Sequence, residues 1–244
     1  MEPIYQQEFT LTDTYVDCHG QLKRSMILHL AQEVAGNHFD RLAMDYDSLA
    51  LRGLFWAITR HRVQVTRLPL RGETIRLETW PMPATRVAYP RSMVAYDAQG
   101  NELFRAITLW VLMDIENRAM VLPGKSGISV PGTLRGGELD APGGLVAKPL
   151  NSSRPRTVAY SDLDRNGHMN NCRYMDWICD LLPSAFHAQH PLKEFTICYL
   201  SEAREGQELN LHWDFLEDGA LRVDAYRHGE TKDERVLSAK LLFG

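Results

Sequence analysis

The sequence predicts an α+β protein built from two similar halves, each with one long helix followed by antiparallel strands. Two observations lead to this fold class. An apolar stripe at helical spacing precedes alternating apolar strands, and this order occurs twice within 244 residues. Between the halves, residues 123–149 contain seven glycines and four prolines and show no periodicity, so they predict a linker.

The first half begins with the predicted helix. Its apolar residues recur at i, i+3, i+4 and i+7 and would share one buried face; they are Ile27, Leu30, Ala31 and Val34. Period-two alternation follows in residues 63–65, 75–77 and 107–113, and residues 97–100 predict a hairpin turn.

The second half repeats this order. A short strand over residues 157–160 precedes a second helical stripe, which consists of Met169, Cys172, Met175, Cys179 and Leu182. Alternating strands follow over residues 209–215, 221–225 and 237–243, with turns at 218–219 and 228–229.

The two halves also share residues just before the helix. Residues 17–22 align with residues 164–169 and keep the aspartate, the glycine and the apolar residue, which a gene duplication explains. Two curved sheets, each wrapped around a long helix, are expected, and this is the double hotdog fold. We therefore predict hotdog domains over residues 1–124 and 150–244, joined by a linker over residues 125–149.

Composition sets the expected environment. The formal net charge of −4 argues against nucleic acid as a natural partner, and no apolar run approaches the roughly 20 residues of a membrane span. The four cysteines form no CxxC pair and the first residues show no targeting pattern, so we expect a cytoplasmic protein. No metal-binding spacing occurs, so we expect neither a metal nor a cofactor.

One stretch of the first half is basic. Six arginines lie within residues 52–76: Arg52, Arg60, Arg62, Arg67, Arg71 and Arg76. A solvated sheet face is the ordinary interpretation of such a stretch, and a docking surface for an acidic partner is the alternative.

The densest polar segment is residues 162–174, where we expect a strand to end and a helix to begin. Turn and cap formation accounts for Asp162, but it does not call for the amide and imidazole of Asn166 and His168. A helix start offers unpaired N–H groups that can stabilise an oxyanion, and we predict this role for the N–H groups of Gly167 and His168. Imidazole is also the natural general acid or base near neutral pH.

At this motif the sequence resembles the acyl-acyl carrier protein (acyl-ACP) thioesterases. Residues 164–171 are similar to the Asp-x-Asn-x-His-x-Asn-Asn signature of that family, and Tyr174 and Trp177 follow. Residues 53–60, 72–73, 78–80 and 106–114 resemble the family as well. The resemblance implies a double hotdog enzyme that hydrolyses fatty acyl-ACP and so ends chain elongation.

The resemblance also implies a catalytic set, namely Asp164, Asn166, His168 and, from the next strand, Glu202. Glu202 and His168 would activate water, with Asn166 orienting the water or acyl group. Asp164 would fix the motif electrostatically. In the plant enzymes a cysteine usually follows the glutamate, and Ala203 stands there, so a thiol mechanism at that position is excluded. Direct attack by a carboxylate stays open.

The first half carries Gln21 in place of His168 and His19 in place of Asn166, so we expect an inactive copy. The resemblance implies that its helix lines a pocket for the acyl chain, whose walls would include Ile27, Leu30, Val34 and Trp56. A plain hydrophobic core is the alternative interpretation.

Three other functions remain open: an acyl-CoA thioesterase, a hotdog dehydratase and a non-catalytic acyl-binding protein. The expected partner is acyl carrier protein loaded with a fatty acyl chain, and the duplication makes a monomer or a homodimer plausible. Cys172 lies beside the motif but falls on the apolar stripe, so we assign it to core packing rather than to nucleophilic attack.

Overall fold

The computed structural model describes residues 3–229 and 231–244, and the chain divides between Ala141 and Pro142 into two compact units. This division falls inside the segment predicted to be a linker.

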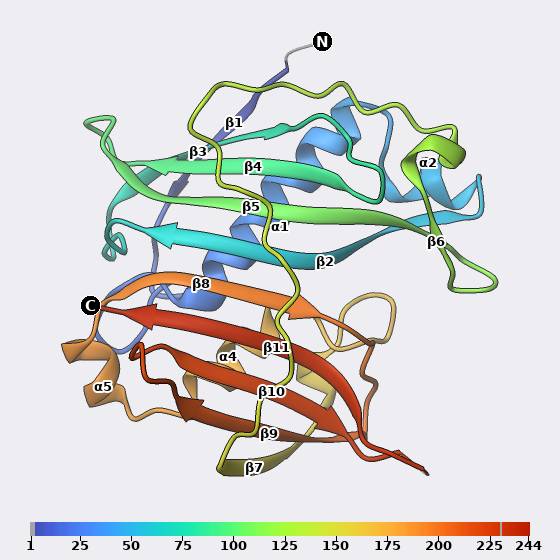
Figure 1. Ribbon diagram of the computed structural model, residues 1–244. Coiled ribbons are helices and arrows are strands. Elements are labelled where there is room, and N and C mark those ends of the chain that lie inside the picture. Colours follow the sequence, from blue (N-terminus) through green and yellow to red (C-terminus); the bar gives the residue numbers. More distant parts are fainter. Residues whose placement is uncertain (1–2, 230) are drawn as a thin grey trace. The chain divides into compact units, whose positions relative to one another are not determined.

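Unit 1 is an antiparallel sheet with a long helix on one face (Figure 1). Its elements are β1 (Tyr5–Thr10), α1 (Arg24–Arg41), α2 (Tyr46–Ala50), β2 (Leu54–Val65), β3 (Thr74–Pro81), β4 (Tyr89–Tyr96), β5 (Glu102–Asp114), β6 (Met120–Val121) and α3 (Pro123–Ser126). The strand order is β1-β3-β4-β5-β2, and β6 pairs with β5. Ile27, Leu30 and Val34 of α1 are fully buried, which confirms the predicted stripe.

Unit 2 is also an antiparallel sheet with helical segments. Its elements are β7 (Ser152–Thr157), the 3-10 turn η1 (Tyr160–Asp162), α4 (Arg173–Cys179), α5 (Ser184–Gln189), β8 (Leu192–Tyr199), β9 (Glu208–Phe215), β10 (Leu221–Arg227) and β11 (Glu234–Phe243). The strand order is β8-β11-β10-β9-β7. The first strand of this unit ends at Thr157, where the sequence predicted a strand to begin.

The helix of unit 2 is much shorter than predicted. The apolar stripe extends to Leu182, but α4 ends at Cys179 after seven residues. Pro183 explains this, because proline has no N–H to donate and disfavours helical geometry in the residue before it. The last turn tightens, with the Leu182 N–H donating to the Cys179 carbonyl at 3.2 Å. The expectation of a long helix in both halves is therefore wrong for the second.

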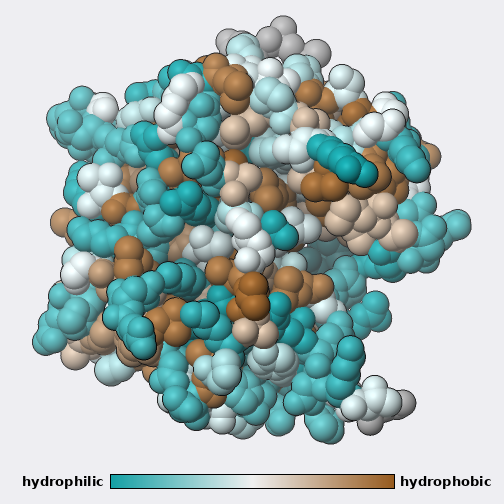
Figure 2. All heavy atoms as spheres, viewed as in Figure 1, coloured by the Kyte–Doolittle hydropathy of each residue, from teal (hydrophilic) through white to brown (hydrophobic). Residues whose placement is uncertain are grey.

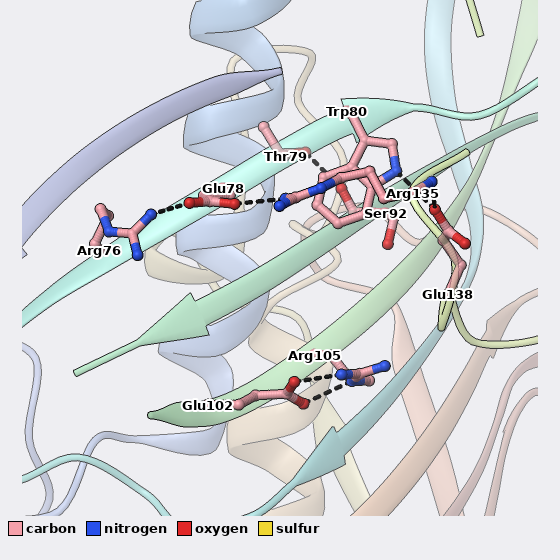
Figure 3. A network of polar contacts seen from close by, with 9 residues as sticks. All are labelled: Arg76, Glu78, Thr79, Trp80, Ser92, Glu102, Arg105, Arg135 and Glu138. Atoms are coloured by element: carbon pink, nitrogen blue, oxygen red, sulfur yellow. Dashed lines mark hydrogen bonds and ion pairs between the residues drawn. The ribbon is translucent and has the colours of Figure 1, made fainter. Parts of the chain in front are cut away.

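The first part of the predicted linker packs on the outer face of the unit 1 sheet. The Thr133 N–H donates to the Pro81 carbonyl at 2.8 Å, and Arg135 pairs with Glu78 (Figure 3). The Arg135 guanidinium also lies 4.8 Å from the Trp80 ring centroid. The segment therefore covers the sheet instead of spanning open solvent.

Because α1 and this segment cover opposite faces of the sheet, β4 is buried on both sides. Every residue from Tyr89 to Ala95 is buried, so this strand shows no period-two pattern that a sequence could reveal. The last part of the predicted linker, residues 142–149, belongs to unit 2, where the Val146 carbonyl accepts from Arg222 at 3.1 Å.

Hydrophilic and hydrophobic residues are mixed over the face drawn in Figure 2. Within the ranges 3–229 and 231–244, no helix combines the length and the apolar character needed to cross a bilayer.

Candidate active site

The polar motif of unit 2 forms a tight loop around Asp164. Its Oδ1 accepts from the N–H groups of Asn166 at 2.8 Å and His168 at 3.2 Å, and its carbonyl accepts from Gly167 at 3.0 Å. Gly167 has a φ of +74°, a left-handed conformation that favours glycine. Asp164 thus organises the backbone that carries the two polar side chains.

Unit 1 contains the same loop 147 residues earlier in the chain. Oδ1 of Asp17 accepts from the N–H groups of His19 at 2.9 Å and Gln21 at 3.1 Å, and its carbonyl accepts from Gly20 at 3.0 Å. Gly20 has a φ of +73°. The alignment of the two halves is confirmed at the level of single hydrogen bonds, and in both halves the aspartate holds the loop.

Glu202 meets His168 across this loop. Nε2 of His168 lies 3.3 Å from Oε2 of Glu202, and the two side chains are 13% and 45% exposed. The Met169 N–H donates to the Ala203 carbonyl at 2.8 Å, which fixes the two segments side by side. Glu202 follows the end of β8 in a loop, so its expected place on a strand is wrong.

The loop that carries Glu202 is held by Arg227 at the end of β10. One guanidinium nitrogen of Arg227 donates to the Glu202 carbonyl at 2.8 Å and to Gln207 Oε1 at 2.9 Å. The other lies 3.3 Å from Ser201 Oγ. Sequence reasoning missed Arg227, since the pairing of β10 with β9 and β11 brings it to this loop.

The predicted oxyanion donors do not fit the structure. The N–H groups of Gly167 and His168 both donate to Asp164 within the loop. They also precede the first residue of α4, Arg173, so they are not the unpaired groups of a helix start.

The hydrogen bonds of unit 1 identify its counterpart of Glu202. The Leu22 N–H donates to the Pro69 carbonyl at 2.9 Å, as Met169 does to Ala203, so Leu68 takes the place of Glu202. Gln21 forms an isolated antiparallel β-bridge with Leu70, and His168 forms the equivalent bridge with Arg204. The loop of unit 1 therefore lacks both the imidazole and the carboxylate.

Neighbouring polar groups have structural partners. Asp162 is buried, and its Oδ2 accepts from the Ala159 N–H at 3.1 Å, which agrees with a capping role. Cys172 is fully buried, and burial raises the pKa of its thiol, as expected of a core residue. Burial likewise raises the pKa of the Tyr174 and Tyr199 phenols. Among the residues that the structure describes, no group of three or more His, Cys, Asp or Glu could hold a metal ion.

The residues predicted to line the acyl pocket lie within unit 1. Ile27, Leu30 and Val34 are fully buried. Trp56 stacks on Phe39 with ring centroids 5.0 Å apart, and its indole N–H lies 3.3 Å from the Met44 carbonyl. Both a plain core and a pocket wall bury these side chains, so their role in binding stays a prediction.

Several arginines of the basic stretch pair with acidic neighbours of unit 1. Arg67 lies 2.8 Å from Glu73, and Arg71 and Arg76 pair with Asp13 and Glu78. Such pairing reduces the positive charge available to an acidic partner.

Comparison with known families gives two matches, one in each half of the chain. A family model described as the acyl-ACP thioesterase N-terminal domain matches residues 2–122, and one described as the C-terminal domain of these enzymes matches residues 148–238. The loop around Asp164 and Glu202 lies within the second match.

Curated relatives of this chain are named as thioesterases or hydrolases of acyl-ACP. Oleoyl-acyl carrier protein thioesterase 2 of Arabidopsis thaliana is 24% identical over 225 residues, which cover 82% of this chain and 60% of that protein. Dodecanoyl-[acyl-carrier-protein] hydrolase of Cinnamomum camphora is 27% identical over 217 residues, with 82% and 56% covered. The chain thus spans little more than half the length of these relatives. Both are named as chloroplastic, and a cytoplasmic location for this chain stays a prediction.

Two solved structures show the same fold. An acyl-ACP thioesterase from Bacteroides thetaiotaomicron matches with a TM-score of 0.90 and 23% identity, covering 99% of this chain and 98% of that one. The 12:0-ACP thioesterase from Umbellularia californica matches with a TM-score of 0.83 and 21% identity, covering 100% and 98%.

Proposed function

Because the chain belongs to the acyl-ACP thioesterase family, we propose that it hydrolyses the thioester of fatty acyl-ACP. Free fatty acid and the carrier thiol are the products, and chain elongation ends. The observation that carries this proposal is the approach of His168 Nε2 to Glu202 Oε2 at 3.3 Å, inside the segment that matches the family's C-terminal domain.

In the proposed reaction a water molecule attacks the thioester carbonyl carbon. The His168–Glu202 pair takes the proton of that water as general base. When the tetrahedral intermediate collapses, the C–S bond breaks and the pair returns a proton to the departing thiolate. Glu202 is 45% exposed, so water and substrate can reach this pair.

Asn166 is the proposed donor to the oxyanion. Its side chain is exposed, and its position in the loop is set by the bond from its own N–H to Asp164. A side-chain amide can supply the hydrogen bond that the N–H groups of Gly167 and His168 already give to Asp164.

Direct attack by Glu202 is the mechanistic alternative. It would form a mixed anhydride and release the carrier thiol before water enters. A single turnover in heavy-oxygen water separates the two routes. Direct attack can transfer a Glu202 oxygen to the fatty acid, whereas the water route places solvent oxygen in every product molecule.

We further propose that each unit is one hotdog domain, with the boundaries predicted from the sequence. The repeated loop at Asp17 and Asp164, and the helix followed by antiparallel strands in both units, support this proposal.

Turnover on panels of acyl-ACPs and acyl-CoAs tests the function and the carrier. His168→Ala is expected to lower turnover by about 10²–10⁴-fold, the usual contribution of a general acid or base. Gln21→Ala, the matching change in unit 1, is the control and is expected to stay within roughly tenfold of wild type. Circular dichroism checks that both variants fold. Equal losses of turnover in the two variants would overturn the model of one active unit. A preference for acyl-CoA over acyl-ACP would show that coenzyme A is the carrier.

A further inference from the structure

Unit 1 buries a guanidinium without a carboxylate partner. Arg91 of β4 is 3% exposed, and among the described residues no acidic side chain pairs with it. One of its terminal nitrogens lies 3.1 Å from His38 Nδ1 and 3.4 Å from Thr79 Oγ1. Since a guanidinium only donates, His38 Nδ1 is the acceptor of this bond.

Several hydrogen-bond donors at this place lack an acceptor. Nε and the second terminal nitrogen of Arg91 have no hydrogen-bond partner, and neither has the indole nitrogen of Trp110. Phe39 links the two residues, with the guanidinium carbon 4.3 Å from its ring centroid and the Trp110 ring edge-on to it at 5.7 Å. Burial lowers the pKa of Arg91 only to about 9, so it is charged at neutral pH.

An unsatisfied buried charge and buried donors are costly, so this cluster is suited to a group that accepts hydrogen bonds. Aromatic rings lie beside the cluster, since Trp56 lies edge-on to Tyr89 at 5.0 Å and to Trp110 at 6.3 Å. The fitting ligand therefore combines an apolar body with an acceptor oxygen.

The cluster also lies next to the helix face expected to meet the acyl chain. His38 follows Val34 by four residues on α1, about one helical turn further along the buried stripe of Ile27, Leu30 and Val34.

We propose that Arg91 and Trp110 form a polar subsite for an oxygen atom carried by the far end of the acyl chain, such as a terminal hydroxyl. This assignment rests on the proposed function and names the substrate class. Arg91 and Trp110 donate to that oxygen, while the aromatic rings around them pack against the chain.

The test compares ω-hydroxyacyl-ACPs with the unsubstituted acyl-ACPs of the same lengths. In wild type the hydroxyl is expected to raise kcat/KM at the chain length that brings it to Arg91. Arg91→Met is expected to lower the ratio of hydroxylated to unsubstituted kcat/KM by about ten- to a hundredfold, the scale of a hydrogen bond to a charged group. Trp110→Phe keeps the ring, loses the donor and should lower the ratio by less. Arg86→Met, which removes an exposed arginine of the same unit, should leave the ratio unchanged.

Several outcomes would overturn the proposal. A wild-type ratio near one at every length means that no such subsite exists. A second such outcome is that Arg91→Met changes the preferred acyl chain length while the ratio of hydroxylated to unsubstituted kcat/KM stays the same. That result means that Arg91 limits the length of the acyl chain without binding its oxygen. Chloride that stabilises wild type but not Arg91→Met, again at an unchanged ratio, means that Arg91 binds a free anion.

Two further measurements keep the subsite testable. If wild type hydrolyses no acyl-ACP, the proposed function fails. The subsite is then tested by thermal shift, where a free ω-hydroxy fatty acid must stabilise wild type more than the unsubstituted acid does. If Arg91→Met does not fold, Arg91→Lys keeps the charge but loses the planar fork, and it should still reduce the ratio.

Discussion

At the residue scale, Asp164 acts as a hydrogen-bond acceptor for its own loop. Its Oδ1 receives two backbone N–H groups, and Asp17 does the same in the unit that lacks the imidazole. An aspartate that performs the same task beside Gln21 is not part of the chemistry there. The shared role supports a positioning function for Asp164 in place of the electrostatic one expected from the sequence.

The substitution Asp164→Asn distinguishes the positioning role of Asp164 from the electrostatic one. Asp164→Asn keeps the Oδ1 acceptor and removes the charge, so turnover is expected to stay within roughly tenfold of wild type. Asp164→Ala frees both N–H groups and should lower turnover by about a hundredfold, because misplacing a catalytic group by about 1 Å costs that much. Asp17→Ala is the control and should lower Tm with little effect on turnover. If Asp164→Asn is as damaging as Asp164→Ala, the charge itself is required.

At the element scale, the loop between β8 and β9 owes its position to Arg227. This residue donates to the Glu202 carbonyl and to Gln207, so it holds Glu202 through the backbone. Arg227→Met is expected to lower kcat about tenfold with little change in KM, because the carboxylate loses its alignment while other binding contacts remain. Lys240→Met, which breaks an exposed ion pair of β11, is the control. A rise in KM alone would show that Arg227 contacts the substrate instead.

The linker provides a second prediction at this scale. A Cβ on Gly132 would lie 2.4 Å from the Pro83 backbone nitrogen, whereas one on Gly143 would meet nothing within 4 Å. Gly132→Ala is expected to cost about 1–3 kcal/mol, and each kcal/mol shifts Tm by roughly 2–4 °C in a chain of this size. Gly143→Ala should leave Tm unchanged in the same melting experiment. Equal Tm values for both variants would mean that the linker does not pack tightly on Met82 and Pro83, which follow β3.

The elements divide into those that a sequence can reveal and those that it cannot. The stripe on α1 was predictable because one face is buried and the other is not. β4 was not, because the linker buries its second face, and a contact so distant in sequence leaves no local pattern. α4 was overestimated because apolar spacing outweighed the effect of Pro183. The cluster at Arg91 depends on β4 and α1 lying together and has no motif.

At the scale of the whole molecule, the duplication keeps the loop and changes its chemistry. The offset between equivalent residues is 147 at Asp17 and Asp164 but 134 at Leu68 and Glu202, because the helical region and the strand that follows it are both longer in unit 1. A single offset therefore aligns the aspartates and misses the glutamate. The sequence could indicate that Gln21 replaces His168, whereas the hydrogen bonds of Pro69 and Ala203 were needed to find Leu68.

The proposed docking of the carrier protein also belongs to the scale of the whole molecule, and the effect of added salt on hydrolysis tests it. Arg67, Arg71 and Arg76 are paired within unit 1, whereas Arg52 is exposed. Arg52→Glu is expected to raise KM for acyl-ACP several-fold at low salt, and added salt should reduce the difference, because exposed charges are screened beyond about 8 Å at physiological ionic strength. Arg86→Glu makes the same charge change outside the basic stretch and should have less effect. Hydrolysis of a small neutral thioester should not respond to either variant. If both variants and both substrates respond alike, the basic stretch does not dock the carrier.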